Sequence, residues 1–581
     1  MSELQTPDIT DVFLHHLEHG GFPHLRRRDL DANHVIEQND ETQHDFGVTL
    51  MDNTERDGSL QQDDYQFLMN FGNISGTSSS LLGGREQDVI YQWPDTWNGL
   101  SFDFLHSWLD KLRKSTLVCP VPFTPFDIAS FSESQKKAFN IVHRHTFGAQ
   151  QNEQLLMIVV GTAGTGKSFL INAIRQLFVQ QNSSEQLKIT APTGIAASNI
   201  HGCTIYSLLS LMNVEINSER LQRLQMEMKN VKLVIIDEYS FLSVAMIDAL
   251  DQRLRIVFPR KCHIPFGGTN ILLCGDPAQL PPVRAQPVYA YYGITLHRAA
   301  RFHLFDKVVE LTQPFRQIGE DPIQIRFREL LARVANCDAT EADWKFLQSR
   351  RSSCLSSEEN KIFDNNIHIV ATNEARHNIN RNKLSGLSPV MKIDSCDDNL
   401  MFVEDDSNEF ERYTNIDSQL FAVGAEVMLT FNLWTEAGLV NGARGTLVAI
   451  LKPKDARKAR VLMVNFTTYR GPPLHPQFPT VVPITQVTTK NVKGVPLTLS
   501  WAITIHKSQG MSMDRITIDL GEKEISSGLT FVALSRARTF LGMRICSFDF
   551  ERYRRIGTGR YVSARRLEFD RLRFLAQKTV Y

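Results

Sequence analysis

A glycine-rich run at residues 161–168 has residue types and a spacing that suit the binding of nucleotide phosphates. It reads Gly-Thr-Ala-Gly-Thr-Gly-Lys-Ser, which fits G-x-x-x-x-G-K-[ST], and it lies between an apolar run and a helix-patterned stretch. Glycines let backbone N–H groups curl around phosphate oxygens, and the N-terminus of the next helix adds positive potential. We expect Lys167 to reach the β- and γ-phosphates and the Ser168 hydroxyl to bind Mg²⁺. The residues assigned to this site are Gly161, Thr162, Ala163, Gly164, Thr165, Gly166, Lys167 and Ser168.

An acidic pair supplies the second half of a hydrolytic site. Asp237 and Glu238 directly follow the apolar run Leu233–Ile236, about seventy residues after the glycine-rich run. A buried strand that ends in two carboxylates places Asp237 on the Mg²⁺ and Glu238 against an attacking water. Such a pair on its own often only caps the next helix. Its position after a phosphate loop favours hydrolysis.

Two arginines, Arg316 and Arg536, could neutralise charge that develops on a γ-phosphoryl group. Arg316 ends the run Gln-Pro-Phe-Arg, and Arg536 ends the run Leu-Ser-Arg. The residues alone favour a simpler reading for each, a surface or salt-bridged arginine.

Strand-then-helix alternation from Phe131 onward predicts a parallel sheet with helices on its faces. The predicted strands of this first block are Leu155–Val160, Lys188–Ala191, Leu233–Ile236 and Ile271–Cys274. A second α/β block begins near His368, is interrupted by a β-rich segment at residues 446–497, and continues to about Phe548.

Composition and charge exclude several classes of protein. The chain has 581 residues, no apolar stretch near the roughly 18–20 residues that a spanning helix needs, and eight scattered cysteines without a C-x-x-C pair. We therefore expect no membrane segment, zinc site or disulfide framework, and a reducing, intracellular compartment. The net charge of −1 conceals an asymmetry, because residues 1–66 hold fifteen acidic against four basic residues, and residues 540–581 hold ten basic against four acidic ones. The basic excess at residues 540–581 is therefore compatible with a polyanionic partner. The alternative explanation is a solvated helix face that carries the arginines at 552–573.

Taken in order, these segments resemble the motifs of superfamily 1B DNA helicases of the PIF/RecD-like family, including the divergent branches of fungal genomes and Helitron-type transposons. The resemblance runs from Phe131 to Phe548, about 70% of the chain. It implies that Gln135 reads adenine, Gln279 senses the γ-phosphate, and Arg316 and Arg536 act as arginine fingers. The matching segments are Phe131–Gln135, Gly161–Ser168, Ala191–Ala197, Asp237–Glu238, Gly275–Val283, Gln313–Arg316, Thr504–Gly510 and Val532–Arg538.

The resemblance also implies an α/β fold with two RecA-like P-loop motor domains, whose sheets are parallel, and a small SH3-like β insert in the second. We expect an acidic, partly disordered region at residues 1–130 and the first motor domain at 131–310. The second motor domain is expected at 311–445 and 498–550, the insert at 446–497, and a basic C-terminal helix at 551–581.

The function implied is that of an ATP- and Mg²⁺-dependent DNA helicase that moves 5′ to 3′ on single-stranded DNA and unwinds tailed duplexes. DNA repair, recombination or telomere maintenance would be its setting. The alternative is a nucleic-acid-stimulated ATPase or translocase that does not unwind, whose transposon origin stays open. A third reading is a transposon-derived relic that binds nucleic acid without turnover, against which the intact hydrolytic residues argue. We expect a monomer in the nucleus, or else in the mitochondrion, with residues 1–130 open to protein partners.

Contacts with the DNA strand are assigned from the matching motifs and from their neighbours. The candidates are Thr193, Gly194, His201, Tyr206, His506 and Lys507. Tyr206 stands where the family usually has histidine, and Pro277-Ala278 replaces a common aromatic pair. Phe431 and Trp434 could stack on bases, but their apolar neighbours favour a place in a hydrophobic core.

Overall fold

The computed structural model describes residues 82–114, 127–211, 216–290, 301–317, 319–394, 401–402, 418–453, 460–488, 493–524, 526–546, 548–559 and 561–580. Its contacts divide the chain at Gly83, and the account below concerns the unit from Gly83 to Tyr581. The predicted acidic segment, residues 1–66, lies outside the described residues. Within the described part of the chain, no helix is long and apolar enough to cross a membrane.

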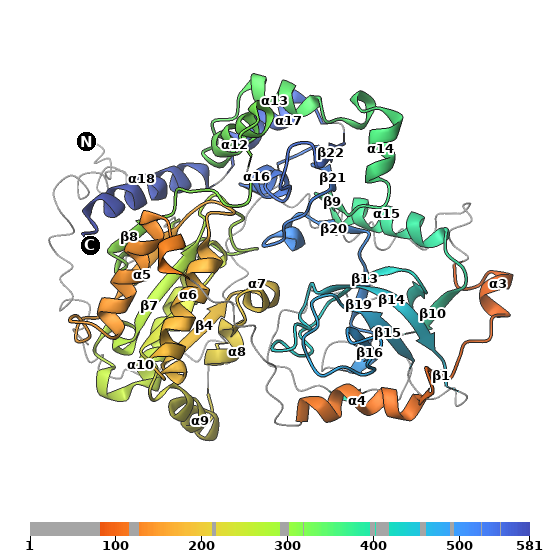
Figure 1. The fold of residues 1–581 in the computed structure, drawn as a ribbon, viewed down its shortest axis with the longest axis horizontal. Coiled ribbons are helices and arrows are strands. Elements are labelled where there is room, and N and C mark those ends of the chain that lie inside the picture. Colours follow the sequence, from red (N-terminus) through yellow and green to blue (C-terminus); the bar gives the residue numbers. More distant parts are fainter. Residues whose placement is uncertain are drawn as a thin grey trace, which may run out of the picture. The chain divides into compact units, whose positions relative to one another are not determined.

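A six-stranded parallel sheet forms the centre of the first α/β block (Figure 1), in the order β5-β4-β6-β7-β3-β8. Its strands are β3 (Leu156–Val160), β4 (Leu187–Ala191), β5 (Cys203–Thr204), β6 (Leu233–Ile236), β7 (Asn270–Gly275) and β8 (Lys307–Glu310). Its helices are α5 (Glu133–Thr146), α6 (Lys167–Gln180), α7 (Gly194–Asn199), α8 (Ile205–Leu209), α9 (Ser218–Met228) and α10 (Val244–Val257). The four predicted strands are confirmed, and the short edge strand β5 and the strand β8 were not predicted.

The apolar character of the central strands follows from burial on both faces. Along β3, Leu156 and Ile158 belong to one hydrophobic cluster, whereas Met157 and Val159 belong to another. Successive side chains of a strand point to opposite faces, so helices must cover both sides of this sheet. The result is a rigid platform whose strand ends carry the candidate site.

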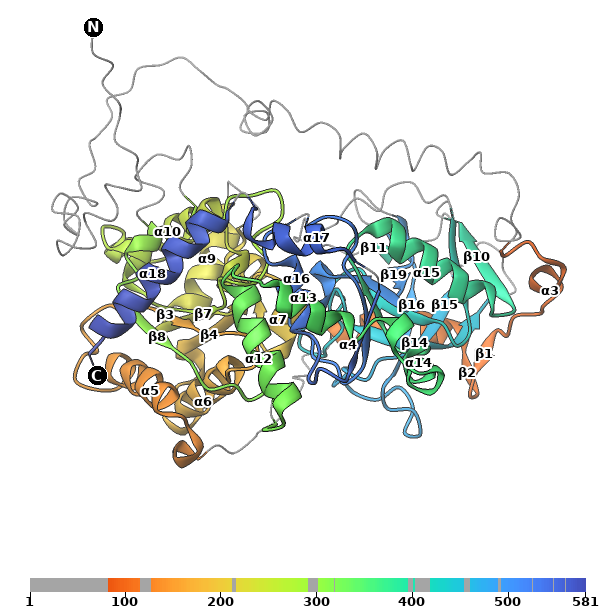
Figure 2. The same ribbon diagram turned by 90° about the horizontal axis from the view of Figure 1, so that it is seen from above.

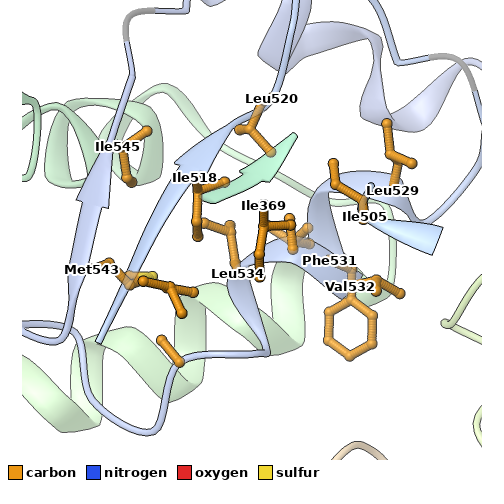
Figure 3. Close-up of a cluster of buried hydrophobic side chains, with 14 of the residues drawn as sticks. Ile369, Ile505, Ile518, Leu520, Leu529, Phe531, Val532, Leu534, Met543 and Ile545 are labelled. Atoms are coloured by element: carbon orange, nitrogen blue, oxygen red, sulfur yellow. The ribbon is translucent and has the colours of Figure 1, made fainter. Parts of the chain in front are cut away.

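The second α/β block is built on a four-stranded parallel sheet in the order β20-β9-β21-β22. These strands are β9 (His368–Val370), β20 (Ala502–Thr504), β21 (Ile516–Asp519) and β22 (Met543–Ile545). The helices of this block are α12 (Pro322–Ala335), α13 (Glu341–Gln348), α14 (Ser357–Phe363), α15 (Asn373–Ser385) and α16 (Leu529–Leu534). Figure 3 shows its core, in which Ile369 and Ile518 of the sheet lie beside Leu534 of α16. The two parallel sheets confirm the predicted RecA-like α/β class.

A five-stranded antiparallel sheet interrupts the second block, in the order β16-β15-β14-β13-β19. Its strands are β13 (Glu426–Leu429), β14 (Arg444–Leu451), β15 (Val461–Asn465), β16 (Val481–Thr485) and β19 (Leu497–Leu499). Smaller pairings join β10 (Val390–Asp394) to β12 (Ser418–Ala422), β11 (Met401–Phe402) to β17 (Val487–Thr488), and β17 to β18 (Lys493–Gly494). The sheet includes β13, which precedes the segment predicted as the insert, and the SH3-like topology stays a prediction. Phe431 is buried in the core of this sheet and Trp434 packs against it, as their apolar neighbours indicated.

The segment that precedes the first block packs on this antiparallel sheet. It contains α3 (Glu86–Val89), a hairpin of β1 (Thr96–Trp97) and β2 (Leu100–Ser101), and α4 (Phe102–Lys114). Phe102 and Leu105 of α4 lie in one cluster with Leu451 and Val461 of the sheet. Within the region expected at residues 1–130, residues 83–114 therefore contribute side chains to a hydrophobic core.

Two helices follow the second block, α17 (Phe550–Arg554) and α18 (Val562–Lys578). Helix α18 lies along β8 of the first block in both ribbon views (Figures 1 and 2), and its Leu572 belongs to the first block's core. Arg552, Arg565 and Arg571 are buried. The prediction that the arginines at 552–573 coat a helix surface is thus wrong for these three, because carboxylates and backbone carbonyls of the folded chain take them up.

Candidate active site

The glycine-rich run forms a tight turn between β3 and α6. Gly164 and Gly166 have φ angles of 90° and 85°, in the left-handed region that favours glycine. A Cβ at Gly164 would also collide with the Arg316 side chain. Helix α6 begins at Lys167, whose Nζ donates to the carbonyl oxygens of Gly161 and Thr162 at 2.7 and 3.0 Å. The lysine amine therefore lies folded over the loop, in the place from which it can reach a phosphate.

The acidic pair follows β6 at the carboxyl edge of the sheet. Burial raises the pKa of Asp237 to about 7, the neighbouring Glu238 charge adds to the rise, and Lys167 opposes it. Asp237 Oδ1 is buried and has no hydrogen-bond partner among the described residues. A buried, unpartnered carboxylate oxygen that shares a cavity with the Ser168 hydroxyl suits a hard cation such as Mg²⁺. Asp237 and Ser168 therefore fit a magnesium site.

Glu238 lies between the two motor blocks. Its φ angle of 53° turns the backbone away from the β6 direction. Gln509, from the turn after β20, lies with its Nε2 atom 3.5 Å from Glu238 Oε2. The second block thus touches the carboxylate that we expect to act as the base. The sequence marked Gln509 only as part of a motif.

Gln279 and the two arginines complete the cavity wall. Burial lowers the pKa of Arg316, and the Glu238 charge opposes this. Burial lowers the pKa of Arg536 to about 9, with the Arg316 charge as the next cause. Arg536 is 1% exposed and donates from Nη1 to the Met511 carbonyl oxygen at 3.0 Å. Two guanidiniums are thus held close together, an arrangement that an anionic phosphate would stabilise. Reading Arg536 as a surface arginine is therefore wrong, whereas Arg316 is half-buried and lines the same cavity.

A cavity of about 280 Å³ brings most of the predicted residues together. The predicted residues that line it are Ala163, Gly164, Gly166, Lys167, Ser168, Asp237, Glu238, Gln279, Arg316 and Arg536. Gln135, Gly161, Thr162 and Thr165 do not line it. Gln135 Nε2 nevertheless donates to the Gly166 carbonyl oxygen at 3.4 Å, which places that amide at the edge of the phosphate loop.

Sequence reasoning missed several lining residues. These are Phe169, Ala196, Asn199, Phe315 and Gly510. Phe169 adjoins Ser168, and Ala196, Phe315 and Gly510 lie inside the matching segments, which is the signal that could have found them. Phe315 N donates to the Gly164 carbonyl oxygen at 2.7 Å and so fixes the Arg316 loop on the phosphate loop.

The candidate strand contacts Thr193 and Gly194 lie at the N-terminus of α7. Thr193 caps this helix, with its Oγ1 accepting from the Ala196 N–H at 3.3 Å. A Cβ at Gly194 would collide with the Asn432 side chain, which also accepts from the Asn441 N–H at 2.8 Å. The start of α7 therefore faces the loop between β13 and β14.

His201 and Tyr206, just beyond α7, are engaged by other protein groups. The ring of His201 contacts Arg470, and Arg470 Nη2 donates to Ser198 Oγ at 3.1 Å. Burial lowers the pKa of His201 to about 4, and the charges of Arg470 and Arg175 add to the shift. Tyr206 Oη donates to Met246 Sδ at 3.3 Å, so this hydroxyl points into the first block.

His506 and Lys507 are half-buried on a short 3₁₀ helix, η8 (His506–Ser508), that follows β20. The same turn continues to Gly510, where a Cβ would lie 3.5 Å from Asn199 Nδ2 at the end of α7. The two motor blocks therefore approach each other at α7 and at this turn. The structure places five of the six candidates beside that junction and turns the Tyr206 hydroxyl away from it.

Comparisons with known proteins give the same assignment. The family model for PIF1-like helicases matches residues 130–343. The ATP-dependent DNA helicase PIF1 of Danio rerio is 30% identical over 407 residues, which cover 67% of this chain and 58% of the relative. The chain thus spans less than two thirds of the length of that relative.

Solved structures cover more of the chain. A Bacteroides Pif1 helicase in complex with ADP-AlF3 and single-stranded DNA matches with a TM-score of 0.54 and 26% identity, over 76% of this chain and 96% of the other. A structure on DNA unwinding at forked double-stranded DNA by two coordinating Pif1 helicases matches with a TM-score of 0.56 and 26% identity, over the same shares. With the motifs and the cavity, these matches establish that the chain is a member of the PIF1-like helicase family.

Proposed function

We propose that the chain is an ATP- and Mg²⁺-dependent DNA helicase that moves 5′ to 3′ on single-stranded DNA and unwinds tailed duplexes. The observation that carries this proposal is the shared cavity, in which Lys167, Asp237 and Glu238 of one motor block meet Arg536 of the other. Hydrolysis at such a junction changes the contacts between two blocks, and a strand that both blocks hold then moves relative to them.

Each cavity residue has a role in this reaction. Lys167 neutralises the β- and γ-phosphates, and Ser168 with Asp237 would hold the Mg²⁺, which neutralises further phosphate charge. Glu238 accepts the proton of the attacking water, and Gln279 contacts the γ-phosphate. Arg316 and Arg536 stabilise charge that develops as the γ-phosphoryl group is transferred.

DNA as the substrate is supported by the relatives, because the Bacteroides Pif1 structure is a complex with single-stranded DNA. The 5′ to 3′ direction, the nuclear location and a role in DNA repair, recombination or telomere maintenance rest on the family resemblance alone. The same holds for a monomeric state and for protein partners at residues 1–130.

The deciding experiment is steady-state ATP hydrolysis with and without single-stranded DNA, with Lys167→Ala as the blank. We expect strong stimulation by DNA that is absent in the variant. Duplexes with a 5′ tail and with a 3′ tail then test direction, and only the first should be unwound. Hydrolysis indifferent to DNA would contradict a DNA-driven motor. Stimulated hydrolysis without unwinding would leave a translocase that does not separate strands.

A further inference from the structure

Helix α18 buries three charged side chains behind the nucleotide cavity. Arg565, Glu568 and Arg571 are 1%, 3% and 3% exposed. Buried charges cost free energy unless they are paired and hydrogen-bonded. A helix that needed only to cover β8 could do so with apolar residues. The burial of these three charges must therefore be explained by the groups that each of them contacts.

Glu568 and Arg571 form an ion pair near Tyr239, the residue that follows Glu238. Their side chains meet at 2.8 Å, and the Arg571 guanidinium lies 4.9 Å from the centre of the Phe302 ring. The Phe302 ring lies 6.1 Å from that of Tyr239, which directly follows Glu238. Burial raises the pKa of Tyr239 well above its ordinary value, and the Glu568 charge adds to the rise. The ion pair of α18 thus lies close to the chain segment that carries Glu238, with the Phe302 ring between them.

Arg565 lies where the two motor blocks touch. Its Nη2 donates to the Ser527 carbonyl oxygen at 2.9 Å, just before α16 begins. At the next residue, Gly528, a Cβ would lie 2.5 Å from the Ala278 carbonyl oxygen and 3.3 Å from that of Gln279. The same Cβ would lie 3.3 Å from Arg565 Nη2. The start of α16, the Gln279 turn and Arg565 are therefore packed against one another.

Helix α18 is anchored in the first block at its other end. Thr579 Oγ1 accepts from the Val308 N–H of β8 at 2.9 Å, and Arg571 Nη1 donates to the Phe305 carbonyl oxygen at 3.4 Å. Arg565 is thus held by a helix fixed to one block while it binds a carbonyl of the other. The helix α16 that it reaches leads to Arg536.

We propose that Arg565 is a positioning residue that sets the register between the Gln279 turn and the start of α16, so that Gln279 and Arg536 approach the same phosphate. The inference rests on the proposed ATP hydrolysis. A misplacement of about 1 Å at a reacting group can cost about a hundredfold in rate. Loss of the Arg565 bond should therefore lower turnover while leaving the phosphate loop, and with it nucleotide binding, intact.

The test uses the full chain and four variants, with Arg573→Ala as the matched control. Arg573 lies on the same helix, but its side chain is 55% exposed, pairs with Asp570 at 3.7 Å and lies over the Phe569 ring. Arg565→Ala removes the bond to Ser527. Arg565→Lys keeps the charge and most of the volume but loses the planar fork, and Glu568→Gln breaks the ion pair. For each protein, kcat and KM for ATP with single-stranded DNA, the affinity for a fluorescent ADP and the Tm are measured.

We expect Arg565→Ala to lower kcat about tenfold or more, with ADP affinity and KM within about twofold of the original. Arg565→Lys should recover part of the loss, Glu568→Gln should lower kcat less, and Arg573→Ala should match the original chain. The inference is overturned if Arg565→Ala keeps full kcat, or if kcat, ADP affinity and Tm fall together. If Arg565→Ala does not fold, a folded Arg565→Lys with full kcat overturns it as well. An original chain without DNA-stimulated hydrolysis would instead contradict the proposed function.

Discussion

The nucleotide cavity and the junction at α7 are both lined by motif residues, yet their side chains are in different states. In the cavity, Asp237 Oδ1 and Gln279 Oε1 are buried without a hydrogen-bond partner among the described residues, so they are ready for a ligand. At the junction, Gly194 faces Asn432 and the His201 ring contacts Arg470. The cavity thus holds buried oxygen atoms without protein partners in the described part of the chain, whereas a strand that bound at α7 would have to replace contacts that the protein already makes.

Lys167→Ala is expected to give the largest difference between an effect on ATP hydrolysis at the cavity and an effect on DNA binding at the junction. Loss of the amine should lower DNA-stimulated ATP hydrolysis at least about a hundredfold, since it removes a charge placed on the phosphates. Binding of single-stranded DNA without nucleotide should not change. Hydrolysis and fluorescence-polarisation assays measure the two effects, and the exposed Lys229→Ala is the control. A loss of DNA binding in Lys167→Ala would show that the two regions are not independent.

Glu238→Gln sharpens the comparison within the cavity. A general base contributes about 10²–10⁴-fold to a rate, so turnover should fall by that factor. ATP binding should persist, because the amide keeps the shape of the carboxylate and Lys167 is untouched. Single-turnover hydrolysis measures the chemical step, and nucleotide titration measures the affinity for ATP. Normal turnover would remove Glu238 as the base.

A smaller effect is expected from Thr193→Ala at the start of α7. Loss of the helix cap costs about 1 kcal/mol of stability. If the strand lies on α7, its affinity should also fall severalfold, while hydrolysis without DNA stays the same. Thr340→Ala removes the equivalent cap of α13 and is the matched control. Equal DNA affinity in the two variants would place the strand elsewhere.

Tyr206→Phe should leave DNA affinity unchanged, because the Tyr206 hydroxyl is bound to Met246 in the first block. The variant tests whether the Tyr206 hydroxyl contacts DNA, as its motif position suggests, or only donates to Met246, as the structure shows. A clear drop in affinity for single-stranded DNA would mean that the hydroxyl leaves Met246 when the strand binds.

A small effect of pH on stability is expected at the junction, through His201. Because the pKa of His201 falls from its ordinary value near 6.5 to about 4 in the folded chain, the unfolded chain binds the proton more readily. The stability that neutral His201 contributes is present above pH 6.5 and is lost as the pH falls through 4. His201 is faced by Arg470 and Arg175, so Arg470→Ala should raise its pKa. Tm measured against pH, with His201→Gln as the reference, checks the sign, and a chain that gains stability towards pH 4 relative to His201→Gln would contradict it.

What the sequence predicted correctly depends on short stretches of chain. The phosphate loop and the strand Leu233–Ile236 were found because glycine spacing and apolar runs are local signals. The second block's contribution to the cavity was reached only through the family resemblance. The burial of Arg536 and the position of Arg316 in the cavity wall depend on packing between segments distant in the sequence, which no local pattern reports.

What the sequence did not predict depends on contacts between residues that are far apart in the chain. Arg552 looks like part of a basic surface, but its partner Glu524 lies 28 residues earlier, at 2.9 Å. Phe102 and Leu105 cover a sheet formed by residues more than three hundred positions later, which no pattern near them identifies. In each case the deciding neighbour is distant in the sequence, and composition near the residue carries no trace of it.

The hydrogen bond between Val308 and Thr579 joins two residues that the ribosome adds at very different times. The two residues are 271 positions apart. A ribosome that adds about 5–20 residues per second therefore makes β8 roughly 15–55 s before its covering helix. During that interval the apolar side chains that pack against Leu572 are open to other nascent chains. An incomplete chain that lacks α18 is thus an aggregation hazard, and the first motor block becomes complete only after residues 562–578 have left the ribosome.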